Sequence, residues 1–306
     1  MKVLITGGSG LVGRNLQDYL SKLQINVLAP SHSELELMDQ VAIERYLVEH
    51  APDLVVHAAG KVGGIQANIA DPVGFLCENL EMGKNLVLAA RNAGVKKLIN
   101  LGSSCMYPKD HSGELSEDMV LSGMLEPTNE GYALAKIVVA RLCSYIREKD
   151  SGYQYKTLIP CNLFGLYDKF DPKNSHLVPA IIKKVVDAKS EGKNTVEIWG
   201  DGTARREFMF ATDLAHIIWE SAQMIDRLPD LLNVGIGKDH SINDYYSIAG
   251  RVVGFEGSFT HDLSKPSGMK RKLVSVEKMH QLGLKAQTSL EEGLQKTYEY
   301  FINEVN

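Results

Sequence analysis

The chain has 306 residues, 23% of them charged and 44% hydrophobic, with 27 glycines and 10 prolines. This length predicts two domains, or one large α/β unit with an appended lobe. The composition excludes disorder, collagen and a coiled coil. The net charge of −5 argues against a general nucleic-acid-binding protein.

Membrane insertion and export are not expected either. The longest apolar runs stop well short of the roughly 20 residues that a bilayer span needs, and residues 1–7 lead into a glycine turn with no small-residue cleavage site. Cys77, Cys105, Cys143 and Cys161 form no C-x-x-C pair, which is typical of reduced thiols in a cytosol. We therefore expect a cytoplasmic protein with neither a membrane nor a nucleic acid as partner.

The first half of the chain alternates short β-branched runs with helical stretches. The pattern predicts strands at 2–6, 25–29, 54–58, 97–102 and 156–160, and helices at 11–23, 40–50, 72–93 and 132–149. Because the strand segments are almost continuously apolar, they suit a parallel sheet that helices cover on both faces. The predicted fold class is α/β, a Rossmann-type doubly wound parallel sheet with a smaller, interleaved C-terminal substrate lobe.

The second half of the chain has longer loops and shorter strands. Strands are predicted at 196–199 and 207–210, Asp213 is expected to cap a helix, and 232–235 is expected to return to the sheet. Ser289 and Glu292 have the spacing of a capping box at the start of the last helix. These features predict a sheet domain over residues 1–165 with a return at about 211–238, and a substrate lobe over 166–210 and 239–306.

A glycine-rich turn joins the first predicted strand to the first helix. Gly7, Gly10 and Gly13 have the spacing G-x-x-G-x-x-G, which lets a backbone approach a pyrophosphate at the start of a helix. The alternative is a turn that is glycine-rich only for tight packing of strand on helix. The position of the motif, directly after a strand, favours dinucleotide binding of the short-chain dehydrogenase/reductase type.

The end of the second strand bears on the choice of cofactor. It reads Ala29-Pro30-Ser31-His32-Ser33, with no carboxylate to hold a ribose hydroxyl and no arginine to clamp a phosphate. Glu34 could still rotate inward. The sequence favours NADP(H) for the sheet domain and leaves NAD(H) open. The expected cofactor-binding residues are Gly7, Gly10, Leu11, Val12, Gly13, Ser31, His32, Asp39, Ala58, Ala59, Leu101, Gly102, Lys136, Pro160, Asn162 and Leu163.

A catalytic set is predicted from the fourth strand and the following helix. Tyr132 and Lys136 are four residues apart, hence on one helix face, where an ammonium would favour the phenolate. By itself the pair is more often a plain surface contact. Ser103 follows the fourth strand, at the carboxyl edge of the sheet where α/β proteins bind ligands. Together the three side chains predict ketone reduction, with Tyr132 as proton donor and Ser103 holding the carbonyl.

Several longer motifs resemble the GDP-L-fucose synthase family of extended short-chain dehydrogenases/reductases. They are residues 102–109 (GSSCMYPK), 127–136 (PTNEGYALAK), 174–176 (NSH), 199–200 (WG), 206–208 (REF), 62–65 (VGGI) and 264–266 (SKP). The resemblance covers nearly the full chain. It implies an NADPH-dependent 3,5-epimerase/4-reductase of GDP-4-keto-6-deoxy-mannose that forms a homodimer through helices around residues 75–90 and 132–149.

The resemblance also implies roles for Cys105 and His176 as base and acid in epimerisation at C3 and C5. Inversion removes a proton on one face of the sugar ring and delivers one on the other, so the two groups would flank the ring. A thiolate is a competent base when a nearby cation or helix start stabilises it. Without the resemblance, Cys105 is better interpreted as a small buried residue and His176 as a histidine at a helix start.

The substrate contacts that the resemblance implies are Lys184, Trp199, Arg206 and Lys272. Cations suit a diphosphate, and an indole can stack on a base or cover a sugar. The run 270–272 (KRK) is equally well explained as a solvated loop. Residues 265–268 read KPSG where the family commonly has KPDG, which leaves the sugar and the cofactor phosphate open.

Three functions follow from these observations. The first is the epimerase/reductase above, and the second is a related GDP-4-keto-sugar C4 reductase that acts on a heptose or a 3,6-dideoxy sugar, with or without epimerisation. The third, a non-catalytic nucleotide-binding regulator, is disfavoured by intact Ser103, Tyr132 and Lys136. No metal is expected, because the nine histidines include no H-x-x-x-H pair and no Cys/His cluster.

Overall fold

The computed structural model describes residues 1–171, 175–264 and 269–305. Its centre is a six-stranded parallel sheet with the order β10-β5-β4-β3-β1-β2. The strands are β1 (Lys2–Thr6), β2 (Asn26–Leu28), β3 (Leu54–His57), β4 (Lys97–Leu101), β5 (Gln154–Pro160) and β10 (Leu231–Val234). The order reverses between β1 and β3, and ligands bind outside the strand ends at such a switch point.

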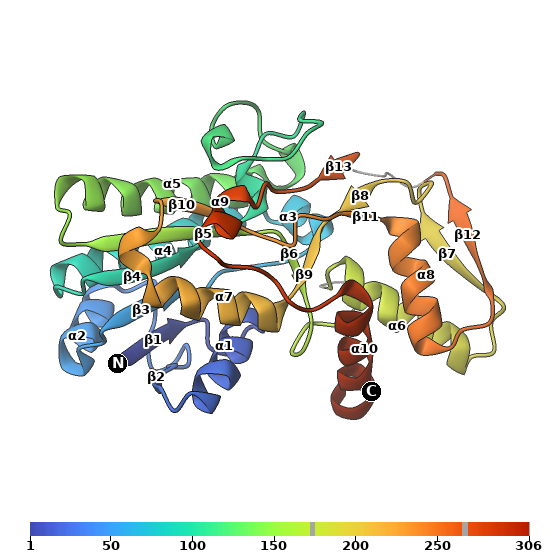
Figure 1. The fold of residues 1–306 in the computed structure, drawn as a ribbon, viewed down its shortest axis with the longest axis horizontal. Helices are drawn as coiled ribbons and strands as arrows, with labels where there is room; N and C mark the ends of the chain where they lie inside the picture. Colours follow the sequence, from blue (N-terminus) through green and yellow to red (C-terminus); the bar gives the residue numbers. More distant parts are fainter. Residues whose placement is uncertain (172–174, 265–268, 306) are drawn as a thin grey trace.

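Helices cover both faces of this sheet (Figure 1). They are α1 (Leu11–Lys22), α2 (Gln40–His50), α4 (Pro72–Asn92), α5 (Glu130–Lys149) and α7 (Ala211–Gln223). Side chains alternate along β1: Val3 and Ile5 join the core under α1 and α7, whereas Leu4 joins the core under α2 and α4. The near-continuous apolar strands thus bury both faces, as predicted.

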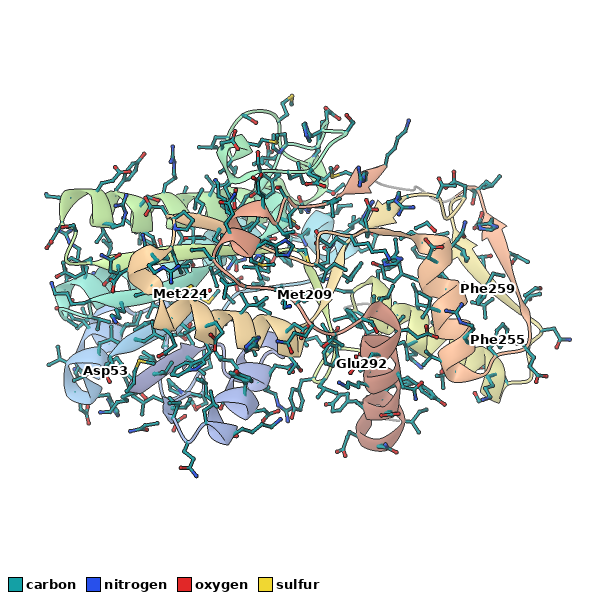
Figure 2. All side chains as sticks on the ribbon, in the orientation of Figure 1. Asp53, Met209, Met224, Phe255, Phe259 and Glu292 are labelled. Atoms are coloured by element: carbon teal, nitrogen blue, oxygen red, sulfur yellow. The ribbon has the colours of Figure 1, made fainter. Side chains whose placement is uncertain are left out.

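A smaller lobe lies beside the sheet domain (Figures 1 and 2). It contains α6 (Leu177–Ser190), β7 (Thr195–Trp199), α8 (Ile242–Val253), β12 (Ser258–Asp262) and α10 (Leu290–Tyr300), which continues into a π-helical segment Phe301–Val305. These elements share a third hydrophobic core, to which Phe164, Phe208 and Phe210 also contribute. The domain limits given above remain a prediction.

The remaining elements are short strands, short helices and turns. They are β6 (Asn162–Phe164), β8 (Arg205–Arg206), β9 (Phe208–Phe210), β11 (His240–Ser241) and β13 (Arg271–Lys272), with α3 (Ile65–Ala70), α9 (Glu277–Gln281) and 3-10 turns at Ser104–Met106, Glu117–Met119, Pro127–Asn129 and Ile225–Arg227. The strand predicted at 207–210 is confirmed as β9, which pairs with β6. The preceding β8, which pairs with β11 and β13, was not predicted.

Two predicted helix caps also differ. Asp213 does not cap α7, whose N-cap residue is Phe210; its carboxylate instead accepts hydrogen bonds from the backbone of Gln287 and Thr288. Ser289 does cap α10 through the backbone N–H of Glu292 at 3.3 Å, but the Glu292 carboxylate pairs with Lys296 rather than closing the box. Within the described residues, no helix is long and apolar enough to cross a membrane.

Candidate active site

The glycine turn after β1 approaches neighbouring backbone very closely. A Cβ on Gly7, whose φ is +73°, would lie 2.6 Å from the Ala59 nitrogen, and one on Gly13 would collide with the Gly7 carbonyl. Packing therefore explains these two glycines. Gly10 is different, because its nearest neighbour, the Gly7 oxygen, would lie 3.4 Å from an added Cβ. Gly10 is the N-cap residue of α1 and has no side chain over the free N–H groups at the helix start, so a pyrophosphate can approach them.

A pocket of about 380 Å³ lies between this turn and the end of β2. Its lining residues are Gly8, Ser9, Arg14, Gln17, Ala29, Pro30, Ser31 and Glu34. The Glu34 carboxylate accepts hydrogen bonds from Ser31 N and Ser31 Oγ, both at 2.7 Å. Glu34, which the sequence left open, thus lines this pocket, and the pocket also contains an arginine, Arg14, that the sequence did not predict there. Arg14 follows the last glycine of the motif directly, and that adjacency is the signal that could have identified it.

Two residues predicted to contact the cofactor have other partners. His32 is exposed and its Nε2 atom lies 3.0 Å from the Glu36 carboxylate, and it is absent from the residues that line the pocket. Asp39 caps α2 by accepting hydrogen bonds from Val41 N and Ala42 N. A role for these two side chains in cofactor binding stays a prediction.

The remaining predicted cofactor residues lie at the carboxyl ends of the strands. Leu11 and Val12 are the first residues of α1, Ala58 and Ala59 follow β3, Leu101 ends β4 and Gly102 follows it, Pro160 ends β5, and Asn162 and Leu163 belong to β6. Asn162 is fixed by a hydrogen bond from its side chain to the Glu207 carbonyl at 2.9 Å. The parallel sheet therefore brings the ends of β1, β3, β4 and β5 to one edge.

Ser103, Tyr132 and Lys136 meet where β4 ends against α5. Ser103 caps the 3-10 turn that follows β4 and forms a hydrogen bond with the Tyr132 phenol. The Lys136 Nζ lies 5.7 Å from the centre of the Tyr132 ring and donates to the Leu101 carbonyl at 3.0 Å. The structure thus brings together the three side chains that the sequence predicted for ketone reduction.

The protonation states differ from the sequence-based expectation. Burial raises the pKa of Tyr132, and the hydrogen bond from Ser103 only partly offsets it. Burial also lowers the pKa of Lys136 to about 8. The expected lowering of the Tyr132 pKa is therefore wrong. Tyr132 keeps its proton, which is the form that donates to a ketone oxygen, as predicted for its role.

The Cys105 sulfur faces two hydrogen-bond donors. The Asn129 Nδ2 lies 3.2 Å from Cys105 Sγ, and the Lys272 Nζ lies 3.6 Å from it. Asn129 precedes α5 and lies three residues before Tyr132, and its Oδ1 is buried without a partner. Because an amide N–H and an ammonium only donate, the sulfur accepts in both contacts, an arrangement that suits a thiolate. No role for Asn129 was predicted from the sequence.

His176 occupies the N-cap position of α6 with its side chain free of the helix. The residue has an exposed surface. The pKa of its imidazole is lowered, first by the protein that surrounds the ring and then by the charge of Lys169. The backbone carbonyl of the preceding Ser175 lies close to Gly64, at 3.5 Å from where a Cβ would be. The motif at 62–65 therefore borders the segment that carries His176. Asn174 and residues 265–268 lie outside the described residues.

The four predicted substrate residues form two pairs. Arg206 and Lys272 are register partners on the parallel strands β8 and β13, and Lys272 is the one that contacts Cys105. Lys184 of α6 donates to the Glu197 carbonyl on β7, the strand that ends at the exposed Trp199. The interpretation of residues 270–272 as a solvated loop is therefore wrong for Arg271 and Lys272, since Asp239 binds both Arg205 and Arg271 across these strands.

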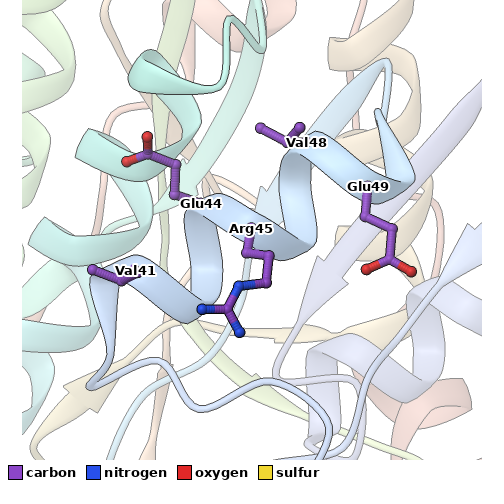
Figure 3. A pocket seen from close by; sticks show the side chains of 5 residues that line it. All are labelled: Val41, Glu44, Arg45, Val48 and Glu49. Carbon is purple, nitrogen blue, oxygen red and sulfur yellow. The ribbon is translucent and has the colours of Figure 1, made fainter.

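A second hollow lies on the outer surface of α2 (Figure 3). It is lined by Val41, Glu44, Arg45, Val48 and Glu49, all on one helix and away from the strand ends. This arrangement supplies no group for the chemistry above. Among the described residues, no three His, Cys, Asp or Glu side chains lie together as a metal site would require.

Comparison with known protein families shows the family of the chain. The model of the NAD dependent epimerase/dehydratase family matches residues 3–235. The chain belongs to this family and is an enzyme of it, as the sequence predicted.

Proteins that match over the full length of the chain include GDP-sugar synthases and a GDP-sugar reductase. The chain is 51% identical to a GDP-L-colitose synthase from Yersinia pseudotuberculosis, over 100% of this chain and 99% of the relative. It is 50% identical to a GDP-L-fucose synthase from Azorhizobium caulinodans, over 99% and 98% of the two chains. A solved GDP-mannoheptose C4 reductase from Campylobacter jejuni with NADP bound has a TM-score of 0.89 and 32% identity, over 99% and 98%. The predicted family and fold class are confirmed.

Proposed function

We propose that the protein is an NADPH-dependent 3,5-epimerase/4-reductase that converts GDP-4-keto-6-deoxy-mannose into GDP-L-fucose. The proposal rests on one observation: the side chains for ketone reduction and the thiol for epimerisation lie together at the end of β4. The reductase set is Ser103, Tyr132 and Lys136, and the Cys105 sulfur faces two donors in the same place. The full-length similarity to a GDP-L-fucose synthase supports the same reaction.

The glycine turn and the strand ends fit a dinucleotide. Gly10 leaves the start of α1 open to the pyrophosphate, and Arg14 in the pocket at the end of β2 can pair with a 2′-phosphate. When bound there, NADPH would supply the hydride that reduction at C4 requires. The NADP in the similar heptose reductase supports this choice.

The protein's own residues handle the protons of reduction. Tyr132 is protonated and hydrogen-bonded to Ser103, so it can pass a proton to the C4 oxygen while Ser103 holds that oxygen. Lys136 remains charged below a pH of about 8 and can stabilise the phenolate that this transfer leaves. Its hydrogen bond to the Leu101 carbonyl fixes the ammonium within the site.

Epimerisation uses the same oxygen donors. When a carbon next to the ketone loses its proton, Tyr132 and Ser103 stabilise the enolate oxygen. Cys105 removes the proton, and Asn129 and Lys272 donate to its sulfur. His176 delivers the proton from the other ring face; because its pKa is lowered, it must take up a proton when the anionic substrate binds.

Arg206, Lys272, Lys184 and Trp199 are proposed to hold the GDP group. The cations Arg206 and Lys272 share one strand pair, which suits the two phosphates, and the exposed Trp199 ring suits the base.

A GDP-4-keto-3,6-dideoxy sugar is the second candidate substrate. The 51% identity to a GDP-L-colitose synthase supports it as strongly as the 50% identity supports fucose synthesis. A 3-deoxy sugar has no stereocentre at C3, so only C5 would be inverted. Incubating the enzyme with each keto sugar and NADPH in D₂O and determining the product by NMR separates the two. Reduction of the 3,6-dideoxy sugar alone would reject the fucose assignment.

We further propose a cytoplasmic homodimer that pairs α4 and α5 of two copies. Leu134, Val138 and Tyr145 form an exposed stripe along α5, and Val73 is exposed at the start of the neighbouring α4. The variant Val138→Glu is expected to be monomeric, as measured by light scattering. A monomeric unmodified protein would reject this assembly.

A further inference from the structure

The pocket at the end of β2 holds two opposite charges. Glu34 and Arg14 both line it, yet no ion pair joins them within the described part of the chain. The two charges have opposite preferences for the group on the adenosine ribose. A 2′-phosphate, as in NADPH, attracts a guanidinium and is repelled by a carboxylate, whereas the 2′-hydroxyl of NADH can donate to a carboxylate.

Glu34 occupies the groups that a 2′-phosphate would use. Ser31 N and Ser31 Oγ both donate to one oxygen of this carboxylate at 2.7 Å, and Ser33 Oγ lies 3.0 Å from Ser31 Oγ. The two Ser31 bonds lower the pKa of Glu34, so the carboxylate is ionised. A phosphate must therefore either displace Glu34 from Ser31 or bind against its charge.

Arg14 also lines the pocket and packs against the ring of Tyr167. The guanidinium carbon of Arg14 lies 3.8 Å from the centre of the Tyr167 ring. The ring is fixed in turn, because the Tyr167 hydroxyl donates to Asp18 at 2.6 Å and the side chain of Asn15 donates to the Leu166 carbonyl at 3.0 Å. Tyr167 also has a φ of 70°, a left-handed conformation that a non-glycine residue adopts only when its surroundings hold it there.

We propose that Glu34 and Arg14 set the cofactor choice in opposite directions, and that Tyr167 positions Arg14 for the 2′-phosphate. Glu34 competes with a 2′-phosphate for the two hydrogen-bond donors of Ser31. It also accepts a hydrogen bond from the 2′-hydroxyl of NADH. The protein therefore accepts both cofactors, and NADPH is favoured only modestly. This inference rests on the proposed dinucleotide-dependent function.

The variants Glu34→Gln, Arg14→Gln and Tyr167→Leu test the proposal. Glu34→Gln should raise the NADPH/NADH ratio of kcat/KM about tenfold, because a charge that opposes the phosphate is removed. Arg14→Gln should lower the ratio about tenfold, and Tyr167→Leu about threefold. Tyr167→Leu added to Arg14→Gln should change nothing further, since Tyr167 acts through Arg14. Tyr167→Phe keeps the ring and should have a smaller effect than Tyr167→Leu.

The matched control is Tyr153→Leu. The ring of Tyr153 has Lys96 Nζ 3.7 Å from its centre, and the two residues directly precede β5 and β4, at the strand ends opposite those that border the pocket. This variant removes a similar cation–ring contact and should leave the cofactor ratio unchanged.

Calorimetric titration with adenosine 2′,5′-bisphosphate and with 5′-AMP isolates the ribose subsite from the chemistry. The affinity for the bisphosphate should rise in Glu34→Gln and fall in Arg14→Gln, and the affinity for 5′-AMP should stay the same in Arg14→Gln. If NADPH binds but all variants keep the original ratio, the inference is overturned and the proposed function stands. If neither NADPH nor NADH binds the unmodified protein, the proposed function itself fails.

Discussion

The side-chain amide of Asn129 lies 3.2 Å from the sulfur of Cys105 and donates to it. The two residues are 24 positions apart, and the contact joins the turn after β4 to the start of α5. It links the residue proposed as the epimerisation base to the helix that carries the proton donor of reduction. Asn129 is therefore a positioning residue for Cys105.

Replacing Asn129 by Leu should slow epimerisation selectively. The change removes one donor to a sulfur that must carry negative charge, and we expect solvent-deuterium incorporation at C5 to fall about tenfold to a hundredfold. Reduction of a pre-epimerised keto sugar should fall much less. Asn92→Leu is the control, since Asn92 only bonds Glu44 at the surface. Equal losses in both reactions would mean that Asn129 merely supports the fold.

Reduction should depend on the ionisation of Lys136. Because burial lowers its pKa to about 8, the ammonium that stabilises the Tyr132 phenolate is lost above that pH. The reduction rate of a pre-epimerised keto sugar, measured at saturating NADPH, should decrease as the pH rises from 8 to 10. Lys136→Met should be slow at every pH and lack this decrease. A rate that stays constant up to pH 10 would contradict the role of Lys136.

Acid should destabilise the fold through His57. This histidine is fully buried at the end of β3 with its Nδ1 2.8 Å from Thr6 Oγ1, and burial, followed by the charge of Lys136, lowers its pKa to about 3. Between pH 6.5 and 3 the unfolded chain binds the extra proton and the folded chain does not. Stability is therefore lost as the pH falls through this range, by roughly 1 kcal/mol per pH unit.

Denaturant unfolding at a series of pH values measures this effect. His57→Gln should be less stable at neutral pH but lose less stability between pH 6.5 and 4. His280→Gln, at an exposed position of α9, should behave like the unmodified protein. An unchanged pH dependence in His57→Gln would refute the assignment.

Glu207→Gln should lower the stability of the protein, because Glu207 holds the chain at Val274, close to Lys272. The buried Glu207 carboxylate accepts hydrogen bonds from Ile236 N and Gly237 N on one oxygen and from Val274 N on the other. A glutamine amide would point a donor at one of these N–H groups, at a cost of about 1–3 kcal/mol. Thermal unfolding should show a lower Tm, and an unchanged Tm would mean that the three hydrogen bonds contribute nothing.

The sequence predicted those features that local pattern determines. Apolar periodicity gave the strands of the sheet and the helices α1, α2, α4 and α5 to within a few residues, and the Tyr132–Lys136 spacing placed both side chains in one site. Contacts between distant segments could not be predicted in this way. Asn129 has no local signature of its function, because its partner Cys105 comes from another segment. Whether Glu34 enters the pocket depends on how the turn after β2 folds back.

Local sequence patterns could not predict the protonation states either. The Y-x-x-x-K spacing suggested that Lys136 lowers the pKa of Tyr132, but the burial of the phenol outweighs any such effect and raises it. Likewise, Asp213 resembles an N-cap residue locally, whereas the chain near Thr288 packs against α7 and takes its carboxylate. Both errors arise from tertiary burial, which local patterns do not encode.

In the proposed mechanism, the end of β4 combines a thiol base, Cys105, with a separate phenol donor, Tyr132. The most direct measurement is NMR of GDP-4-keto-6-deoxy-mannose incubated with NADPH in D₂O and either Cys105→Ser or Tyr132→Phe. We predict that Cys105→Ser loses deuterium incorporation at C3 and C5 yet still reduces the pre-epimerised sugar, while Tyr132→Phe loses reduction. Deuterium incorporation by Cys105→Ser at the rate of the unmodified enzyme would contradict the account.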